Sequence, residues 1–72
     1  MTGRHLAKRS ISIAGHRSSV ALEPAFWAVL ERMASQRRLS LAALVAELDA
    51  RRDPRVPLAS VLRLAALSAG AS

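Results

Sequence analysis

The sequence predicts a mostly α-helical fold with a short β-ribbon, built as an intertwined homodimer and carrying an additional C-terminal helix. Residues 17–22 alternate polar and apolar side chains, and two amphipathic helical patterns follow them with no further strand. A chain of 72 residues folding alone would bury only about 60% of its surface. Because a lone strand leaves both edges unpaired, we expect the same strand of a second copy to pair with it across a two-fold axis.

The residues before this strand are open to two interpretations. Residues 1–8 show no hydrophobic period and are predicted to be a flexible basic arm. Residues 10–14 alternate and are a candidate strand, which a type II′ turn at Gly15 and His16 would fold back onto residues 17–22. This register places Ile11 opposite Val20, and Ile13 opposite Ser18. The alternative leaves residues 9–14 as an arm, extended in the free protein or ordered by its target.

The strand at residues 17–22 has an apolar and a polar face, because successive side chains of a strand point to opposite sides. Val20 and Leu22 share the apolar face, and Arg17, Ser19 and Ala21 share the other. The apolar face is expected to meet the helices.

The first helix is predicted over about residues 24–37, since Pro24 is well placed at the first helical position. The second is predicted over about 40–52, with Ser40 as its N-cap and Leu39 and Leu44 at hydrophobic-staple spacing. Their apolar stripes and the strand supply the predicted dimer core, which consists of Val20, Leu22, Phe26, Trp27, Leu30, Met33, Leu44, Val45 and Leu48.

Residues 9–53 thus form one domain, and residues 54–72 are a linker with a helix over about 57–67. Pro54 and Pro57 end the second helix, because each restricts the residue before it. The last helix is apolar apart from Arg63. We expect it to be covered by its own dimer, or else to dock a second protein or form a tetramer.

Charge points to a polyanionic partner. The chain has 11 Lys and Arg against 5 Asp and Glu, a net charge of +6. Arg4, Lys8, Arg9 and Arg17 all precede the first acidic residue, Glu23. This basic segment favours contact with phosphates, with Arg4, Lys8 and Arg9 as candidates, whereas a tail that only aids solubility is the simpler alternative.

Other function classes find little support in the composition. The chain has no Cys, which removes thiolate metal sites and Cys nucleophiles. No metal, cofactor or catalytic set is predicted, so an enzyme is not expected. No apolar run is long enough to span a membrane, and the cytoplasm is the expected location.

The order strand, helix, tight turn and Ser-capped helix resembles the ribbon-helix-helix family, the Arc/MetJ/CopG superfamily of small dimeric DNA-binding proteins. The resemblance covers about residues 17–52. It rests on the alternating strand at residues 19–22, the restart of the helical pattern at residues 39–44, and the apolar set Phe26, Trp27, Leu30, Met33 and Ala34.

The resemblance implies that two paired strands enter the major groove of double-stranded DNA. Carried over by position, Arg17, Ser19 and Ala21 would read base edges. Ser40 and the backbone N–H groups of Leu41 and Ala42 would bind a phosphate, although a cap role alone explains the Ser40 side chain.

Two features depart from the family pattern. Arg38 stands where the family often has Gly in the turn between the helices, which suggests a tighter or strained turn. A hairpin from Ser10 would widen the dimer's ribbon to four strands, whereas the major groove, about 12 Å wide, accepts two.

The sequence therefore predicts a homodimeric DNA-binding protein, most simply a transcriptional repressor of a short palindromic or repeated operator. One alternative is an antitoxin that regulates its own operon and captures a toxin through residues from Pro57 onward. Another is a protein-interaction dimer without a DNA target.

Overall fold

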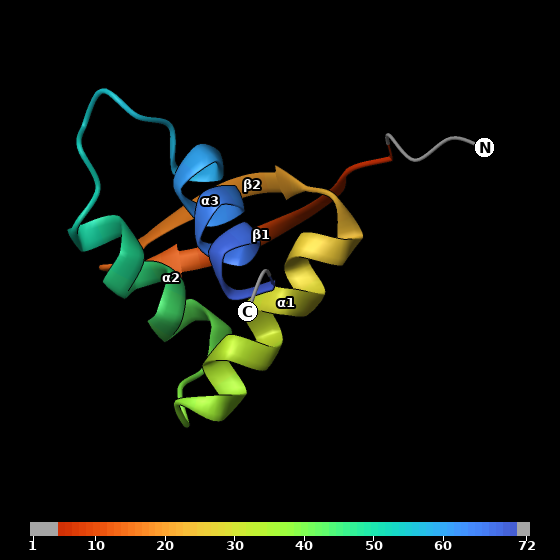
Figure 1. Cartoon of the computed structure of the whole chain (residues 1–72). Coiled ribbons are helices and arrows are strands. Elements are labelled where there is room, and N and C mark those ends of the chain that lie inside the picture. The colour runs from red at the N-terminus through yellow and green to blue at the C-terminus, as the bar shows by residue number, and fades with distance from the viewer. Residues whose placement is uncertain (1–4, 71–72) are drawn as a thin grey trace.

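The computed structural model describes residues 5–70 as a two-stranded antiparallel ribbon packed against three helices (Figure 1). This architecture confirms the predicted fold class, including the additional C-terminal helix. Pairing between two copies is not visible in a single chain and stays a prediction. The elements are β1 (Ala7–Ile13), β2 (His16–Leu22), α1 (Pro24–Gln36), α2 (Leu41–Ala50) and α3 (Leu58–Gly70).

The two strands form a hairpin, but its turn and register differ from the predicted ones. The turn is Ala14 and Gly15, with φ angles of 51° and 83°, as in a type I′ turn rather than the predicted II′. Ile11 pairs with Ser18 and Ile13 with His16, two residues away from the prediction. Because the shift is even, every side chain keeps its predicted face.

The first strand is longer than predicted and replaces part of the expected arm. It begins at Ala7 rather than Ser10, so Ala7 and Lys8 belong to the ribbon. Residues 1–4 of the predicted arm lie outside the described residues. The indole Nε1–H of Trp27 donates to the carbonyl oxygen of Ala7 at 2.7 Å. This bond attaches the start of β1 to α1. A flexible arm would not make such a contact.

The hydrophobic core closes within one chain. Both strands point one face at the helices, and each helix contributes buried side chains to a single cluster. Its members are Ile11, Ile13, Val20, Leu22, Trp27, Leu30, Ala34, Leu44, Val45, Leu62 and Ala66. The remaining residues of the predicted dimer core, Phe26, Met33 and Leu48, are partly buried against this cluster. Thus β1 and α3 cover apolar surface that the sequence assigned to a second copy.

The turn between α1 and α2 has Arg38 at the left-handed position that Gly usually occupies. Arg38 adopts a left-handed backbone with φ of 58°. The N–H of Leu39 donates to the carbonyl oxygen of Ala34 at 2.8 Å, and that of Arg38 to Ser35 at 3.0 Å. These two bonds make a Schellman motif, in which the left-handed position is usually Gly. The expected strain therefore lies at one residue.

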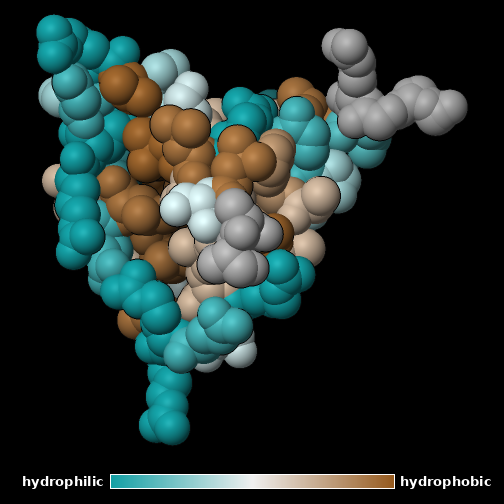
Figure 2. Space-filling model, viewed as in Figure 1, coloured by the Kyte–Doolittle hydropathy of each residue, from teal (hydrophilic) through white to brown (hydrophobic). Residues whose placement is uncertain are grey.

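The third helix packs against α1 and β2 of its own chain. Its inner face is therefore covered without a second copy. Arg63 forms an ion pair with Glu23 at 3.2 Å, and its guanidinium lies 5.8 Å from the centroid of the Phe26 ring. Leu64 and Leu67 point outward and are 64% and 52% exposed. Figure 2 shows apolar side chains gathered over α3, whereas the loop before it is mostly hydrophilic.

Candidate nucleic-acid interface

The outward face of the ribbon brings together the residues predicted to read bases. Residues directly opposite in an antiparallel pair point to the same side, and this side faces away from the core. Five of its six side chains are exposed, and Ala21 is half-buried. The face consists of three cross-strand pairs, namely Lys8 with Ala21, Ser10 with Ser19, and Ser12 with Arg17.

This face carries positive charge and hydroxyl groups. Lys8 and Arg17 occupy opposite corners of the three pairs, and the sequence contains no acidic residue before Glu23. Arg can donate two hydrogen bonds to guanine, a Ser hydroxyl can donate or accept, and a methyl such as that of Ala21 can contact thymine. The chemistry suits the edges of base pairs between two rows of phosphates.

Arg9, a predicted phosphate contact, lies on the other side of the ribbon. Its Nη1 is 2.7 Å from the Glu31 carboxylate, and its guanidinium lies 5.0 Å from the centroid of the Trp27 ring. Arg9 therefore joins β1 to α1, and the structure does not bring it together with Lys8 and Arg17. Arg4, the remaining predicted contact, lies outside the described residues.

The predicted phosphate site at the start of α2 has the expected local geometry. Ser40 is the N-cap, and its Oγ accepts a hydrogen bond from the N–H of Ala43 at 3.0 Å. The side chain is exposed. The N–H groups of Leu41 and Ala42 belong to the first turn, which has no intrahelical acceptors for them. They can meet a phosphate, but they lie on a different element from the ribbon face.

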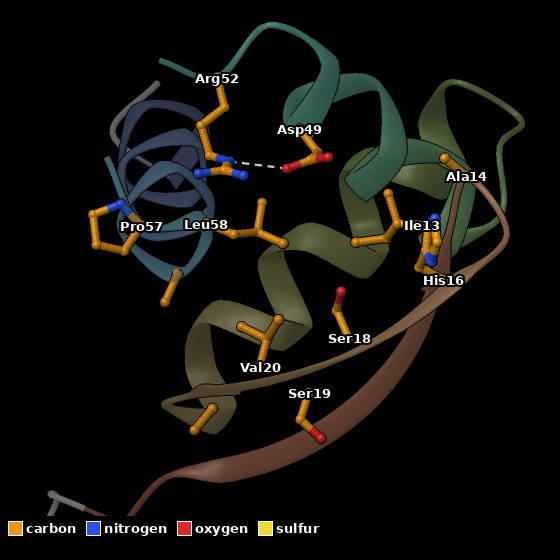
Figure 3. A pocket seen from close by; sticks show the side chains of 12 residues that line it. Ile13, Ala14, His16, Ser18, Ser19, Val20, Asp49, Arg52, Pro57 and Leu58 are labelled. Carbon is orange, nitrogen blue, oxygen red and sulfur yellow. Dashed lines mark hydrogen bonds and ion pairs between the residues drawn. The ribbon is translucent and has the colours of Figure 1, made fainter. Parts of the chain in front are cut away.

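The outer edge of β2 borders a cavity of about 640 Å³ between the ribbon, the end of α2 and the start of α3. In Figure 3, Ser18 and Val20 point toward the helices, while Ser19 points away on the opposite face. Arg52 at the cavity wall pairs with Asp49 at 2.9 Å and donates to the carbonyl oxygen of Val56 at 2.8 Å. The guanidinium of Arg52 is thus bound by groups of its own chain.

Ser10 and Ser12 are the members of the outward face to which the sequence interpretation gives no role. The signal is present, since the alternation in residues 10–14 already places their side chains beside those of residues 17–21. The sequence interpretation left open whether residues 10–14 form a strand, and so it assigned no role to Ser10 and Ser12. Within residues 5–70, three or more potential metal ligands do not gather at any point, and none of the helices there has the length and apolar character to cross a membrane.

These features define a small ribbon-and-helix protein whose two-stranded ribbon presents a basic, polar face. The comparisons identify the family. The ribbon-helix-helix domain matches residues 6–69, and the chain belongs to this family, whose members are commonly DNA-binding regulators or antitoxins. The comparison with curated proteins gives no match.

A solved structure shares the fold. It is that of an uncharacterized protein from Bordetella pertussis Tohama I, with a TM-score of 0.77 and 24% sequence identity. The match covers 96% of the present chain and 58% of the other. The chain therefore spans little more than half the length of that protein, and the likeness extends to the fold alone.

Proposed function

We propose that this protein is a sequence-specific double-stranded DNA-binding protein that acts as a homodimer in the cytoplasm and represses transcription. The observation that carries the proposal is the outward ribbon face, which holds Lys8 and Arg17 and no carboxylate. Phosphates attract such a face by counterion release, and its side chains match base edges. Occupation of a short palindromic or repeated operator would block transcription directly, with no ligand or catalytic step.

In this mechanism the ribbon enters the major groove. Arg17, Ser19 and Ala21 contact base edges, while Lys8 and the start of α2 at Ser40 contact phosphates. Phosphate contacts set the orientation of the protein, and base contacts set the sequence it prefers.

The test is binding of the purified protein to its preferred duplex and to a scrambled duplex of equal length, across salt concentrations. Arg17→Ala is expected to cost about 1–3 kcal/mol on the preferred duplex and much less on the scrambled one, since a bidentate contact to a base is lost. Arg32→Ala is the matched control, because Arg32 is an exposed arginine on α1. Equal losses for both variants, or none for Arg17→Ala, would remove Arg17 from base reading.

A second candidate function, capture of a toxin by an antitoxin, is favoured by the exposed Leu64 and Leu67 on α3. Here the purified product of a toxin-like neighbouring gene would bind the wild-type protein. The double substitution Leu64→Ser and Leu67→Ser would abolish that complex and leave DNA binding unchanged. A complex that survives the double substitution would show that α3 is not the capture surface.

A further inference from the structure

Strand β1 presents a row of hydrogen-bond donors on the outward face of the ribbon. Lys8, Ser10 and Ser12 follow one another along this face, and all three are exposed. Each lies opposite a residue of β2 and points to the same side as that residue. Ammonium and hydroxyl groups can all donate to the oxygens of a phosphate. The row therefore suits an anionic surface, and the proposed function gives a role only to Lys8.

The place of β1 in a dimeric ribbon follows from the free edge of β2. Within residues 5–70 the sheet has two strands, so one edge of β2 pairs with no strand. Strand β1 is less open to a further strand, because the carbonyl oxygen of Ala7 already accepts the Trp27 bond at 2.7 Å. In addition, Arg9 is held by Glu31. A second copy that pairs through β2 leaves one β1 as the outer strand on each side.

The width of the major groove separates the inner strands of such a ribbon from the outer ones. Neighbouring strands lie about 4.8 Å apart. With the two β2 strands in the middle, each β1 therefore lies about 7 Å from the central axis of the ribbon. A groove about 12 Å wide has its walls about 6 Å from its own axis. The β2 strands thus lie over the bases, and each β1 strand lies over a row of phosphates.

Strand β1 is held in place by its own chain. Its inward side chains Ile11 and Ile13 belong to the hydrophobic core and are only 6% and 7% exposed. The Trp27 bond attaches the start of the strand to α1. The outward hydroxyls of β1 therefore lose little conformational freedom on meeting a phosphate.

From these observations we infer that β1 is the phosphate-contacting strand of the dimer's ribbon, and that Ser10 and Ser12 donate hydrogen bonds to the DNA backbone beside Lys8. The inference rests on the proposed function, since it requires that a dimeric ribbon enters the major groove. The two strands of the hairpin then have different tasks. Strand β2 reads base edges, and β1 sets the position of the ribbon between the two rows of phosphates.

The test is the dissociation constant of the full-length protein for a preferred duplex, selected from a random pool, and for a scrambled duplex, across salt concentrations. Ser10→Ala and Ser12→Ala remove the hydroxyl, whereas Ser10→Thr and Ser12→Thr keep it. Ser35→Ala is the control, since Ser35 is an exposed serine on α1. Lys8→Ala is measured beside them, and thermal unfolding checks that each variant is folded.

We expect Ser10→Ala and Ser12→Ala each to weaken binding about fivefold on both duplexes, as for one weak hydrogen bond lost from each copy. The threonine variants and Ser35→Ala should match the wild type. Lys8→Ala should also weaken both duplexes alike. In addition, it should reduce the steepness of log K against log salt by about 2, since each copy loses one charged phosphate contact.

If the alanine variants change the preference between the two duplexes, Ser10 and Ser12 read bases and the inference is wrong. It is also wrong if these variants bind both duplexes as tightly as the wild type, or if the threonine variants bind as weakly as the alanine variants. The proposed function survives each of these results provided that Arg17→Ala still lowers the preference. A wild-type protein that prefers no sequence refutes both.

Discussion

Arg38 shows how one residue stores strain that the fold tolerates. The left-handed backbone costs a residue with a Cβ about 1–2 kcal/mol, and glycine avoids this cost but loses more entropy on folding. We therefore expect Arg38→Gly to raise the free energy of unfolding by about 0.5 kcal/mol, or about 3 °C in Tm. Arg38→Ala removes the same charge but keeps the Cβ, so it should not stabilise. Chemical denaturation of the three proteins would check this, and equal stabilisation by both variants would point to charge repulsion as the cause.

In the turn of the hairpin, the left-handed position at Gly15 is occupied by glycine. Its φ of +83° suits glycine, and a Cβ added there would meet no atom within 4 Å. Gly15→Ala should thus lower the free energy of unfolding by about 1 kcal/mol through the backbone alone. Ala14→Asn should raise it, because Asn-Gly is the preferred pair in a type I′ turn. Urea unfolding of both variants measures these effects, and a Gly15→Ala protein as stable as the wild type would contradict the assigned turn.

Among the elements, α3 is joined to the junction of β2 and α1 by the ion pair between Arg63 and Glu23. The pKa of Glu23 is lowered, first by a hydrogen bond from its own backbone N–H, against partial desolvation, and then by the guanidinium of Arg63. Because the folded-state pKa lies below the unfolded one, this stabilisation is present above about pH 4.3. It is lost as the pH falls through the folded-state value.

We therefore expect stability to fall on acidification below about pH 4.3, and Glu23→Gln to reduce this dependence. The measurement is the free energy of unfolding against pH for both proteins. Arg63→Gln provides the matched variant, since it removes the partner and should also flatten the profile. A wild-type profile that Glu23→Gln leaves unchanged would show that other carboxylates, such as Asp53 beside Arg55, dominate.

The elements also show where sequence reasoning was sufficient. Pro24 and Ser40 begin α1 and α2 as predicted or within one residue of it, because their local chemistry suits those positions. The faces of both strands were correct, since a two-residue periodicity fixes them. The hairpin register was wrong because the prediction placed Gly15 first in the turn, whereas Ala14 tolerates the left-handed position. Nothing local in the sequence excludes either turn.

Long-range contacts account for the rest. The prediction that the arm includes Ala7 and Lys8 was wrong, because two long-range contacts attach β1 to α1. Trp27 binds Ala7, 20 positions away, and Glu31 binds Arg9, 22 positions away. Likewise, an apolar α3 suggests a partner helix, and only the tertiary structure shows that its Leu62 and Ala66 complete the core of the same chain. Arg17, Ser19 and Ala21 share the outward face of the ribbon, as the alternation predicts. Their contacts with DNA stay predictions.

At the scale of the whole molecule, the hydrophobic core forms within one chain. We therefore expect the chain to fold without first pairing with a second copy. In an obligate dimer, a 100-fold dilution removes about 2.7 kcal/mol of apparent stability, or about 10 °C in Tm when both chains unfold together. Here β1 and α3 cover the core within one chain, so we expect Tm to change little over that dilution. Calorimetry or fluorescence of Trp27, which is the sole Trp of the chain, would follow unfolding. A Tm that falls steeply on dilution would instead show that a second copy stabilises the fold, and the open edge of β2 beside the cavity at Ser18 and Val20 would be the first contact to test.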